Sequence, residues 1–192
     1  MSRTVPGHSA PAAGFEVPLE MLSACHGRIE QQCSTLRRLQ PHLLAHGADD
    51  QARAAAAAVM RYFDIAARQH HEDEERDLFP ALLESMAGSD PVCLRELTSN
   101  LAAEHRELEV AWRRIRAVLE RVEAGEAVAL DPEHVESFVD LYARHIEREE
   151  KELLPMAARL LSDGELDVIG RAMRERRGIL QTDWRAAGEG VG

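Results

Sequence analysis

The sequence predicts an all-α protein, an up-down-up-down four-helix bundle with a short extra helix at its C-terminal end. Apolar residues recur at three- and four-residue spacing from Phe15 to about Arg177, which is the period of an amphipathic helix. No segment rich in Val, Ile and Thr alternates between apolar and polar residues as a strand would. Glycine and proline signals divide the stretch into four long helices with short connections, a pattern typical of such a bundle.

Each predicted helix has recognisable start and stop signals. Gly47 ends the first helix, and Asp49 or Asp50 caps the second. The second contains Pro80, whose missing N–H predicts a kink rather than a stop. The pairs Asp90-Pro91 and Asp131-Pro132 each place a capping residue before a proline at the first helical position. The expected helices cover Pro18 to His46, Asp50 to Glu84, Pro91 to Ala124, Pro132 to Leu161 and, after a Ser162–Glu165 capping box, Asp163 to Arg177.

Length and composition limit the domain organisation and the partners. We expect a disordered segment over 1–15, the bundle over 16–162, and a short helix with a flexible tail over 163–192. The net charge of −11 argues against nucleic acid or an anionic membrane surface as partner. No apolar run approaches the roughly 20 residues that span a bilayer, and the three cysteines form no C-x-x-C pair. These features predict a cytoplasmic protein.

A duplicated motif carries the functional signal. His70-His71-Glu72-Asp73-Glu74-Glu75 is echoed by His145-Ile146-Glu147-Arg148-Glu149-Glu150, and each copy precedes a proline. Residues four apart lie on the same face of a helix, so His70 with Glu74, and His145 with Glu149, form two chelating pairs. A further histidine, His26 or His105, stands on the helix before each copy at a nearly equal offset.

All six of these residues fall on predicted core-facing stripes. His26 lies between Leu22 and Ile29, and His105 between Leu101 and Leu108. Burying two carboxylates and four imidazoles without compensation could cost more than the ~5–15 kcal/mol net stability of a domain. Divalent or trivalent cations would compensate them, and imidazole with carboxylate is a donor set of non-haem iron. The sequence therefore predicts a two-metal site in which Glu74 and Glu149 bridge the ions.

This pattern resembles the hemerythrin HHE cation-binding domain over roughly Leu19 to Leu161. The resemblance implies a four-helix bundle with two non-haem iron ions, oxo- or hydroxo-bridged, and manganese or zinc as the alternative metals. It implies six metal ligands: His26, His70, Glu74, His105, His145 and Glu149. Oxygen-carrying hemerythrins supply five histidines and two carboxylates, whereas four histidines and two glutamates match here. Fewer protein ligands leave more positions for solvent or substrate.

Several neighbouring residues allow more than one interpretation. His71 and Glu75 are shifted by one position and are expected on a solvated face or behind the ligands. Glu30 and Glu109 stand four residues after His26 and His105, and either orient them or lie at the surface. Two tyrosines precede the chelating pairs and either pack in the core or donate a hydrogen bond to a bound molecule; they are Tyr62 and Tyr142.

Two functional classes follow from the motif. The first is a di-iron protein that binds, senses or reacts with O₂, peroxide or NO at an open iron position, with a small diatomic or peroxide as its partner. The second is an iron-responsive regulatory module in which the metal controls folding. The sequence identifies no catalytic residue, and it leaves enzymatic activity, redox partner and oligomeric state open, a dimer included.

Overall fold

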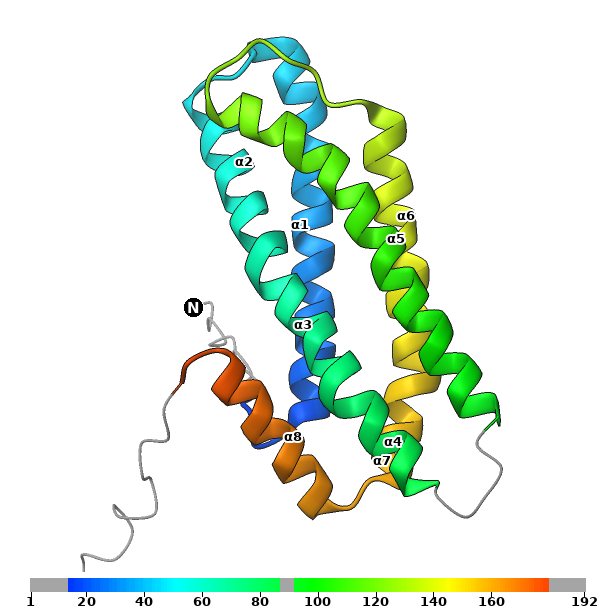
Figure 1. The fold of residues 1–192 in the computed structure, drawn as a ribbon. Helices are drawn as coiled ribbons and strands as arrows, with labels where there is room; N and C mark the ends of the chain where they lie inside the picture. The colour runs from blue at the N-terminus through cyan, green and yellow to red at the C-terminus, as the bar shows by residue number, and fades with distance from the viewer. Residues whose placement is uncertain (1–13, 87–91, 180–192) are drawn as a thin grey trace, which may run out of the picture.

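The computed structural model describes residues 14–86 and 92–179. Within these ranges the chain is helical and has no strand, so the predicted fold class is confirmed. Four long segments run alternately up and down the bundle, and a short helix crosses its lower end (Figure 1). The segments are α1 (Pro18–His46); α2 (Asp50–Arg61), η1 (Tyr62–Ala67), α3 (Arg68–Asp73), η2 (Glu74–Leu78) and α4 (Phe79–Ser85); α5 (Val92–Glu123); α6 (Pro132–Arg148), η3 (Glu149–Leu153) and α7 (Leu154–Leu160); and the crossing helix α8 (Asp163–Arg176).

The helix caps lie where the sequence signals place them. The side chain of Asp49 accepts a hydrogen bond from the backbone N–H of Ala52 at 2.8 Å, and Asp131 does the same for Glu133 at 2.9 Å. Ser162 and Glu165 form the predicted reciprocal capping box. The cap predicted at Asp90 lies outside the described residues, as do most of the segments 1–15 and 178–192 that we expect to be irregular.

The second and fourth segments contain π-helical turns, which sequence reasoning did not predict. In place of the single kink expected at Pro80, η2 occupies the five residues before α4, and η3 occupies the five before α7. Each of these turns lies just ahead of a proline, Pro80 or Pro155. A proline ring clashes with the carbonyl four residues earlier, and a wider turn accommodates that clash within a continuous helix.

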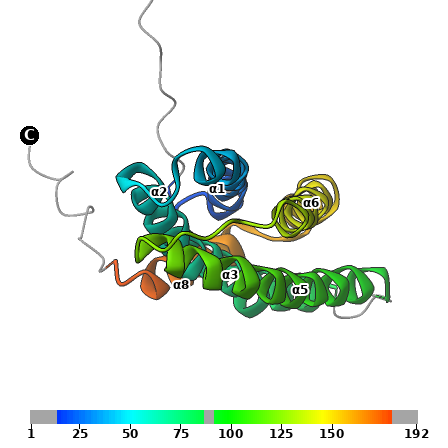
Figure 2. The same ribbon diagram turned by 90° about the horizontal axis from the view of Figure 1, so that it is seen from above.

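The short helix α8 packs against α1, α3 and η2 (Figure 1; Figure 2). Its last turn brings Arg176 and Arg177 onto Asp73, a side chain that is completely buried. Arg176 also pairs with Asp77 at 2.6 Å. The charged run from Glu72 to Asp77 is therefore partly a docking surface for α8, because paired arginines compensate the buried carboxylate of Asp73.

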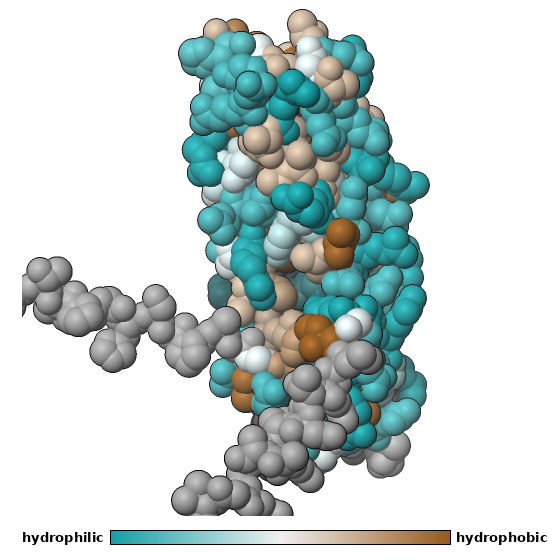
Figure 3. Space-filling model, turned by 90° about the vertical axis from the view of Figure 1, so that its left-hand side faces the viewer, coloured by the Kyte–Doolittle hydropathy of each residue, from teal (hydrophilic) through white to brown (hydrophobic). Residues whose placement is uncertain are grey.

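The bundle interior consists of two apolar clusters along its length. One cluster includes Ile29, Leu108 and Phe138 and is called the upper cluster, because it lies toward the connection between α1 and α2 at the top of Figure 1; the other, the lower cluster, includes Leu22, Leu78 and Leu101. The outer surface on the left of Figure 1 is largely hydrophilic with scattered apolar patches (Figure 3). Within the described ranges, no helix has the length and hydrophobicity needed to cross a membrane.

Candidate metal centre

A layer of polar side chains separates the two apolar clusters. His26 lies between Leu22 of the lower cluster and Ile29 of the upper one, and the other helices repeat this arrangement. None of the six side chains is more than 5% exposed. The structure thus brings together in the core all six residues that the sequence singled out: His26, His70, Glu74, His105, His145 and Glu149.

The six residues form two overlapping groups that share both carboxylates. One group contains His26 and His70 with Glu74 and Glu149, and the other contains His105 and His145 with the same two glutamates. Within each group one potential ligand atom per residue lies within 4.8 Å of all the others. Two sets of two imidazoles joined by two shared carboxylates is the arrangement expected of two cations bridged by carboxylates.

Glu149 lies at the middle of the layer. Its carboxylate oxygens lie 3.0 Å from Nε2 of both His26 and His145, and 3.9 Å from Nε2 of His70 and of His105. Glu74 is 3.3 Å from His105 and 3.6 Å from His70. In both copies the chelating glutamate is also the first residue of a π-helical turn, a feature that is frequent at functional sites.

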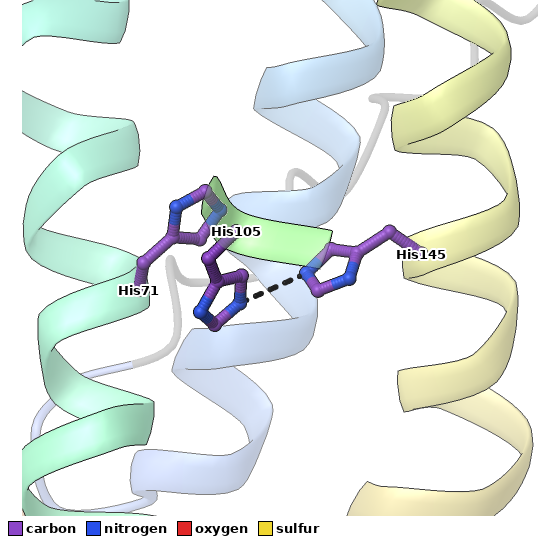
Figure 4. Close-up of side chains that lie close together, drawn as sticks. All are labelled: His71, His105 and His145. Atoms are coloured by element: carbon purple, nitrogen blue, oxygen red, sulfur yellow. Dashed lines mark hydrogen bonds between the residues drawn. The ribbon is translucent and has the colours of Figure 1, made fainter. Parts of the chain in front are cut away.

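A second set of carboxylates holds three of the four histidines from behind. Nδ1 of His26 lies 2.6 Å from Glu150, and Nδ1 of His105 lies 2.8 Å from Glu75. Nδ1 of His145 lies 2.9 Å from Glu104. In a neutral imidazole, an Nδ1–H donated to a carboxylate directs the Nε2 lone pair toward the centre, which is the tautomer that a metal ligand needs. Nε2 of His105 and Nε2 of His145 are hydrogen-bonded to each other at 3.1 Å (Figure 4).

The supporting carboxylates are themselves part of the sequence duplication. Glu75 and Glu150 directly follow the chelating glutamates, and each reaches across to the histidine of the other helical hairpin. The alternative of a purely solvated Glu75 is therefore wrong, and the repeated Glu-Glu pair was the signal that could have identified it. Glu30 and Glu109 are exposed and, within the described part of the chain, make no hydrogen bond to His26 or His105.

His71 also belongs to this region, which agrees with the expected position behind the ligands and not with a solvated face. Its ring stacks on that of His105 with centroids 4.0 Å apart and planes 12° apart, and His145 faces the pair (Figure 4). A helix in a bundle has two neighbours in different directions, so adjacent residues of α3 can both face inward. His70 is directed toward His26 of α1, and His71 toward His105 of α5.

The two tyrosines have different surroundings. Tyr62 donates its hydroxyl to the backbone carbonyl of Cys25 at 3.3 Å, so this hydroxyl serves the packing of α1 against η1. Tyr142 packs among the aromatic residues of the upper cluster, and its ring also lies 6.1 Å from that of His71. Only Tyr142 therefore borders the polar layer from above.

The protein charges in the layer are mutually dependent. Burial alone would lower the pKa of His26 and of His105, but the facing carboxylates outweigh it and raise these values to about 9 and about 10. Burial lowers the pKa of His70 to about 3, because no carboxylate supports its Nδ1. Burial and the charge of Glu149 raise the pKa of Glu74 to about 7. Protonated imidazoles thus supply part of the positive charge that the carboxylates require.

Protonation of the imidazoles does not give every polar atom of the layer a hydrogen-bond partner. Eight buried side-chain atoms of the described residues have no hydrogen-bond partner, and every one belongs to this region. They include both oxygens of Glu74 and of Glu149, and both ring nitrogens of His70. Nε2 of His26 is close to Glu149 but lacks hydrogen-bond geometry. These nitrogen and oxygen atoms lack hydrogen-bond partners and are directed toward a common point. Such a set of ligand atoms fits bound transition-metal cations.

Comparison with known proteins agrees with this geometry. The sequence matches the family described as "Hemerythrin HHE cation binding domain" over residues 17–157. An uncharacterized protein of Haemophilus influenzae is 32% identical over 167 residues, which cover 87% of this chain and 94% of the relative. The matched region begins one residue before α1 and ends within α7, so it contains the whole polar layer.

Proposed function

Because the chain belongs to the hemerythrin HHE cation-binding domain family, we propose that it is a non-haem di-iron protein that binds, senses or reacts with O₂, peroxide or NO. The observation that carries the proposal is the buried layer of imidazole nitrogens and carboxylate oxygens that lack hydrogen-bond partners, between two apolar clusters. Each buried polar atom that lacks a partner costs roughly 1–3 kcal/mol of folding free energy. A bound cation would offset this cost, which supports a metal-binding role for the layer.

Each residue has a defined task in this proposal. Glu74 and Glu149 are shared by both groups and would bridge the cations. His26 and His70 would hold one ion, and His105 and His145 the other. Non-haem iron supplies open coordination positions and one-electron redox chemistry when it is bound. The six protein groups provide fewer donors than two octahedral ions can accept, which supports an open position for a small molecule.

Metal analysis tests the proposal. Protein purified anaerobically and reconstituted with ferrous iron should contain about two irons per chain and develop visible charge-transfer bands on exposure to air. Glu149→Ala should lose most of this iron, because Glu149 belongs to both groups. His46→Gln, on the exposed surface of α1, should retain it and serves as the matched control.

Fewer than about one metal per chain after reconstitution would contradict the proposal. Full loading with zinc or manganese and poor loading with iron would keep the site and overturn the di-iron assignment, in favour of a hydrolytic or structural metal. Titration of the reduced iron protein with NO, O₂ and peroxide would then identify the reacting molecule.

A further inference from the structure

A cavity connects the surface of the bundle to one side of the polar layer. It has a volume of about 670 Å³ and lies between the helical segment of η1, α3 and η2 on one side and α5 on the other. Its lining includes His71, His105 and Tyr142, together with exposed charged side chains such as Arg106 and Glu109. A second cavity, of about 360 Å³, is lined by residues of α1 and α2 and touches none of the six.

The cavity reaches the two groups unequally. Among the six candidate ligands only His105 lines it, so it opens on the group that contains His105 and His145. His26 and His70 contribute nothing to its wall. A small molecule that entered here would therefore meet the cation on the His105 side first.

His71 stands where the cavity meets this group. Nε2 of His71 is buried and has no hydrogen-bond partner among the described residues. A nitrogen of His71 also lies within 4.8 Å of ligand atoms of His105 and His145. An unpaired, buried imidazole nitrogen at the inner end of a cavity requires a partner that the described protein residues do not supply.

Ring orientation argues that this partner is not the cation itself. An imidazole nitrogen binds a metal through a lone pair in the plane of its ring. The rings of His71 and His105 are stacked, with planes only 12° apart. Lone pairs in two nearly parallel, offset planes do not converge on one ion. The nitrogen of His71 instead faces the space beside an ion held by His105, where a bound small molecule would lie.

Resting on the proposed function, we propose that small molecules reach the centre through the cavity between α3 and α5 and that His71 donates a hydrogen bond to them. The molecule is bound on the His105 and His145 side, and it carries a hydrogen-bond-accepting end, as azide, peroxide and NO do. His71 is a binding residue in this proposal and not a seventh metal ligand.

Azide binding to the air-oxidised, iron-loaded protein tests the role of His71. His71→Leu keeps the bulk of the side chain and removes the donor, so azide affinity should fall about tenfold, the size of one hydrogen bond to a charged group. His71→Gln restores an N–H and should recover most of the affinity. His46→Gln should bind azide like the natural protein. Iron content, measured in parallel, should be the same in all four proteins.

The possible outcomes separate this inference from the proposed function. Normal iron content with unchanged azide affinity in His71→Leu would overturn the role of His71 alone. Loss of iron in His71→Leu would show that His71 is a metal ligand and would also overturn it. Absence of iron from the natural protein would instead contradict the proposed function.

A second variant tests the route. Glu109→Trp places a large ring at an exposed position of the cavity wall, away from the polar layer. Stopped-flow mixing with azide should show association and dissociation rate constants that fall by a common factor, with the affinity unchanged. Rates equal to those of the natural protein would mean that small molecules enter elsewhere.

Discussion

At the scale of single residues, the carboxylates behind the histidines determine how the centre is oriented. Glu104 accepts from Nδ1 of His145 and is itself held by Arg148 at 2.7 Å. This chain of contacts holds the ring plane of His145 and keeps its Nδ1 on the side away from the centre. The imidazole can then meet a cation without first losing rotational freedom.

Removal of this support should weaken metal binding although no ligand is lost. We expect Glu104→Ala to lower the affinity for ferrous or cobaltous ion by about 10- to 100-fold, because His145 would have to be ordered by the metal alone. Glu104→Gln retains a carbonyl acceptor for Nδ1–H and should show an intermediate affinity. Competition against a chromophoric chelator measures the affinities of these variants directly.

Glu107→Ala is the matched control, because Glu107 lies on the exposed face of the same helix. Its metal affinity should equal that of the natural protein. Equal affinities of Glu104→Ala and Glu107→Ala would show that the contact between Glu104 and His145 has no part in metal binding.

The sequence predicts the grouping of the six residues better than it predicts their surroundings. Spacing of four within a helix is enough to pair His70 with Glu74. By contrast, the contact between His105 and Glu75 joins two helices, and its existence depends on their rotation and relative height. The inward direction of His71 depends on the same interhelical geometry, so helical periodicity alone does not decide between a solvated face and a position behind the ligands.

At the scale of helices and turns, boundaries set by caps were predictable and the widened turns were not. A capping side chain such as Asp49 acts on its own first turn, so the signal is local in the sequence. A π-helical turn such as η2 depends on a proline downstream and on the packing of the glutamate that begins it. The sequence showed Pro80, but a kink and a widened turn are both available responses to a proline.

The close packing of α8 against the start of α1 gives a prediction at this scale. A Cβ at Gly170, in the middle of α8, would overlap the backbone carbonyl oxygen of Phe15. Alanine normally stabilises a helix interior by about 1 kcal/mol relative to glycine. Here we expect the opposite, a loss of about 1–3 kcal/mol in Gly170→Ala, because backbone atoms must move apart. Urea unfolding of the metal-loaded protein measures this free energy.

Gly27 provides the comparison. It lies within α1, and a Cβ at this position would meet nothing within 4 Å. Gly27→Ala should therefore raise the free energy of unfolding by about 0.5–1 kcal/mol. If both alanine variants were stabilised alike, α8 would not lie against residue 15 as described.

At the scale of the whole molecule, we expect the polar layer to make stability depend on metal content. The two apolar clusters are joined through a layer whose buried charges are compensated only in part by protein groups. A cation that binds the folded chain alone stabilises it by about 4 kcal/mol at a thousandfold excess over its dissociation constant. The fold could be predicted without reference to a metal, but the free energy of unfolding cannot, because it includes the contribution of any bound cation.

Metal removal should therefore lower the melting temperature substantially. For a chain of this length 1 kcal/mol corresponds to about 2–4 °C, so we expect the apo protein to melt about 10 °C below the iron-loaded protein. Circular dichroism melts of both forms at one protein concentration measure the difference. A regulatory role, in which iron loss exposes a partner surface, requires a difference of at least this size.

Glu74→Gln tests whether the difference in melting temperature comes from metal binding or from a low stability of the apo protein itself. The amide matches the carboxylate in shape and is neutral, so it removes a buried charge while disabling a shared ligand. Its melting temperature without metal should equal or exceed that of the apo natural protein, because an uncharged group costs less to bury. Added iron should no longer raise it appreciably. A natural protein whose apo and iron-loaded forms melt together would contradict the dependence on metal and, with it, the folding switch.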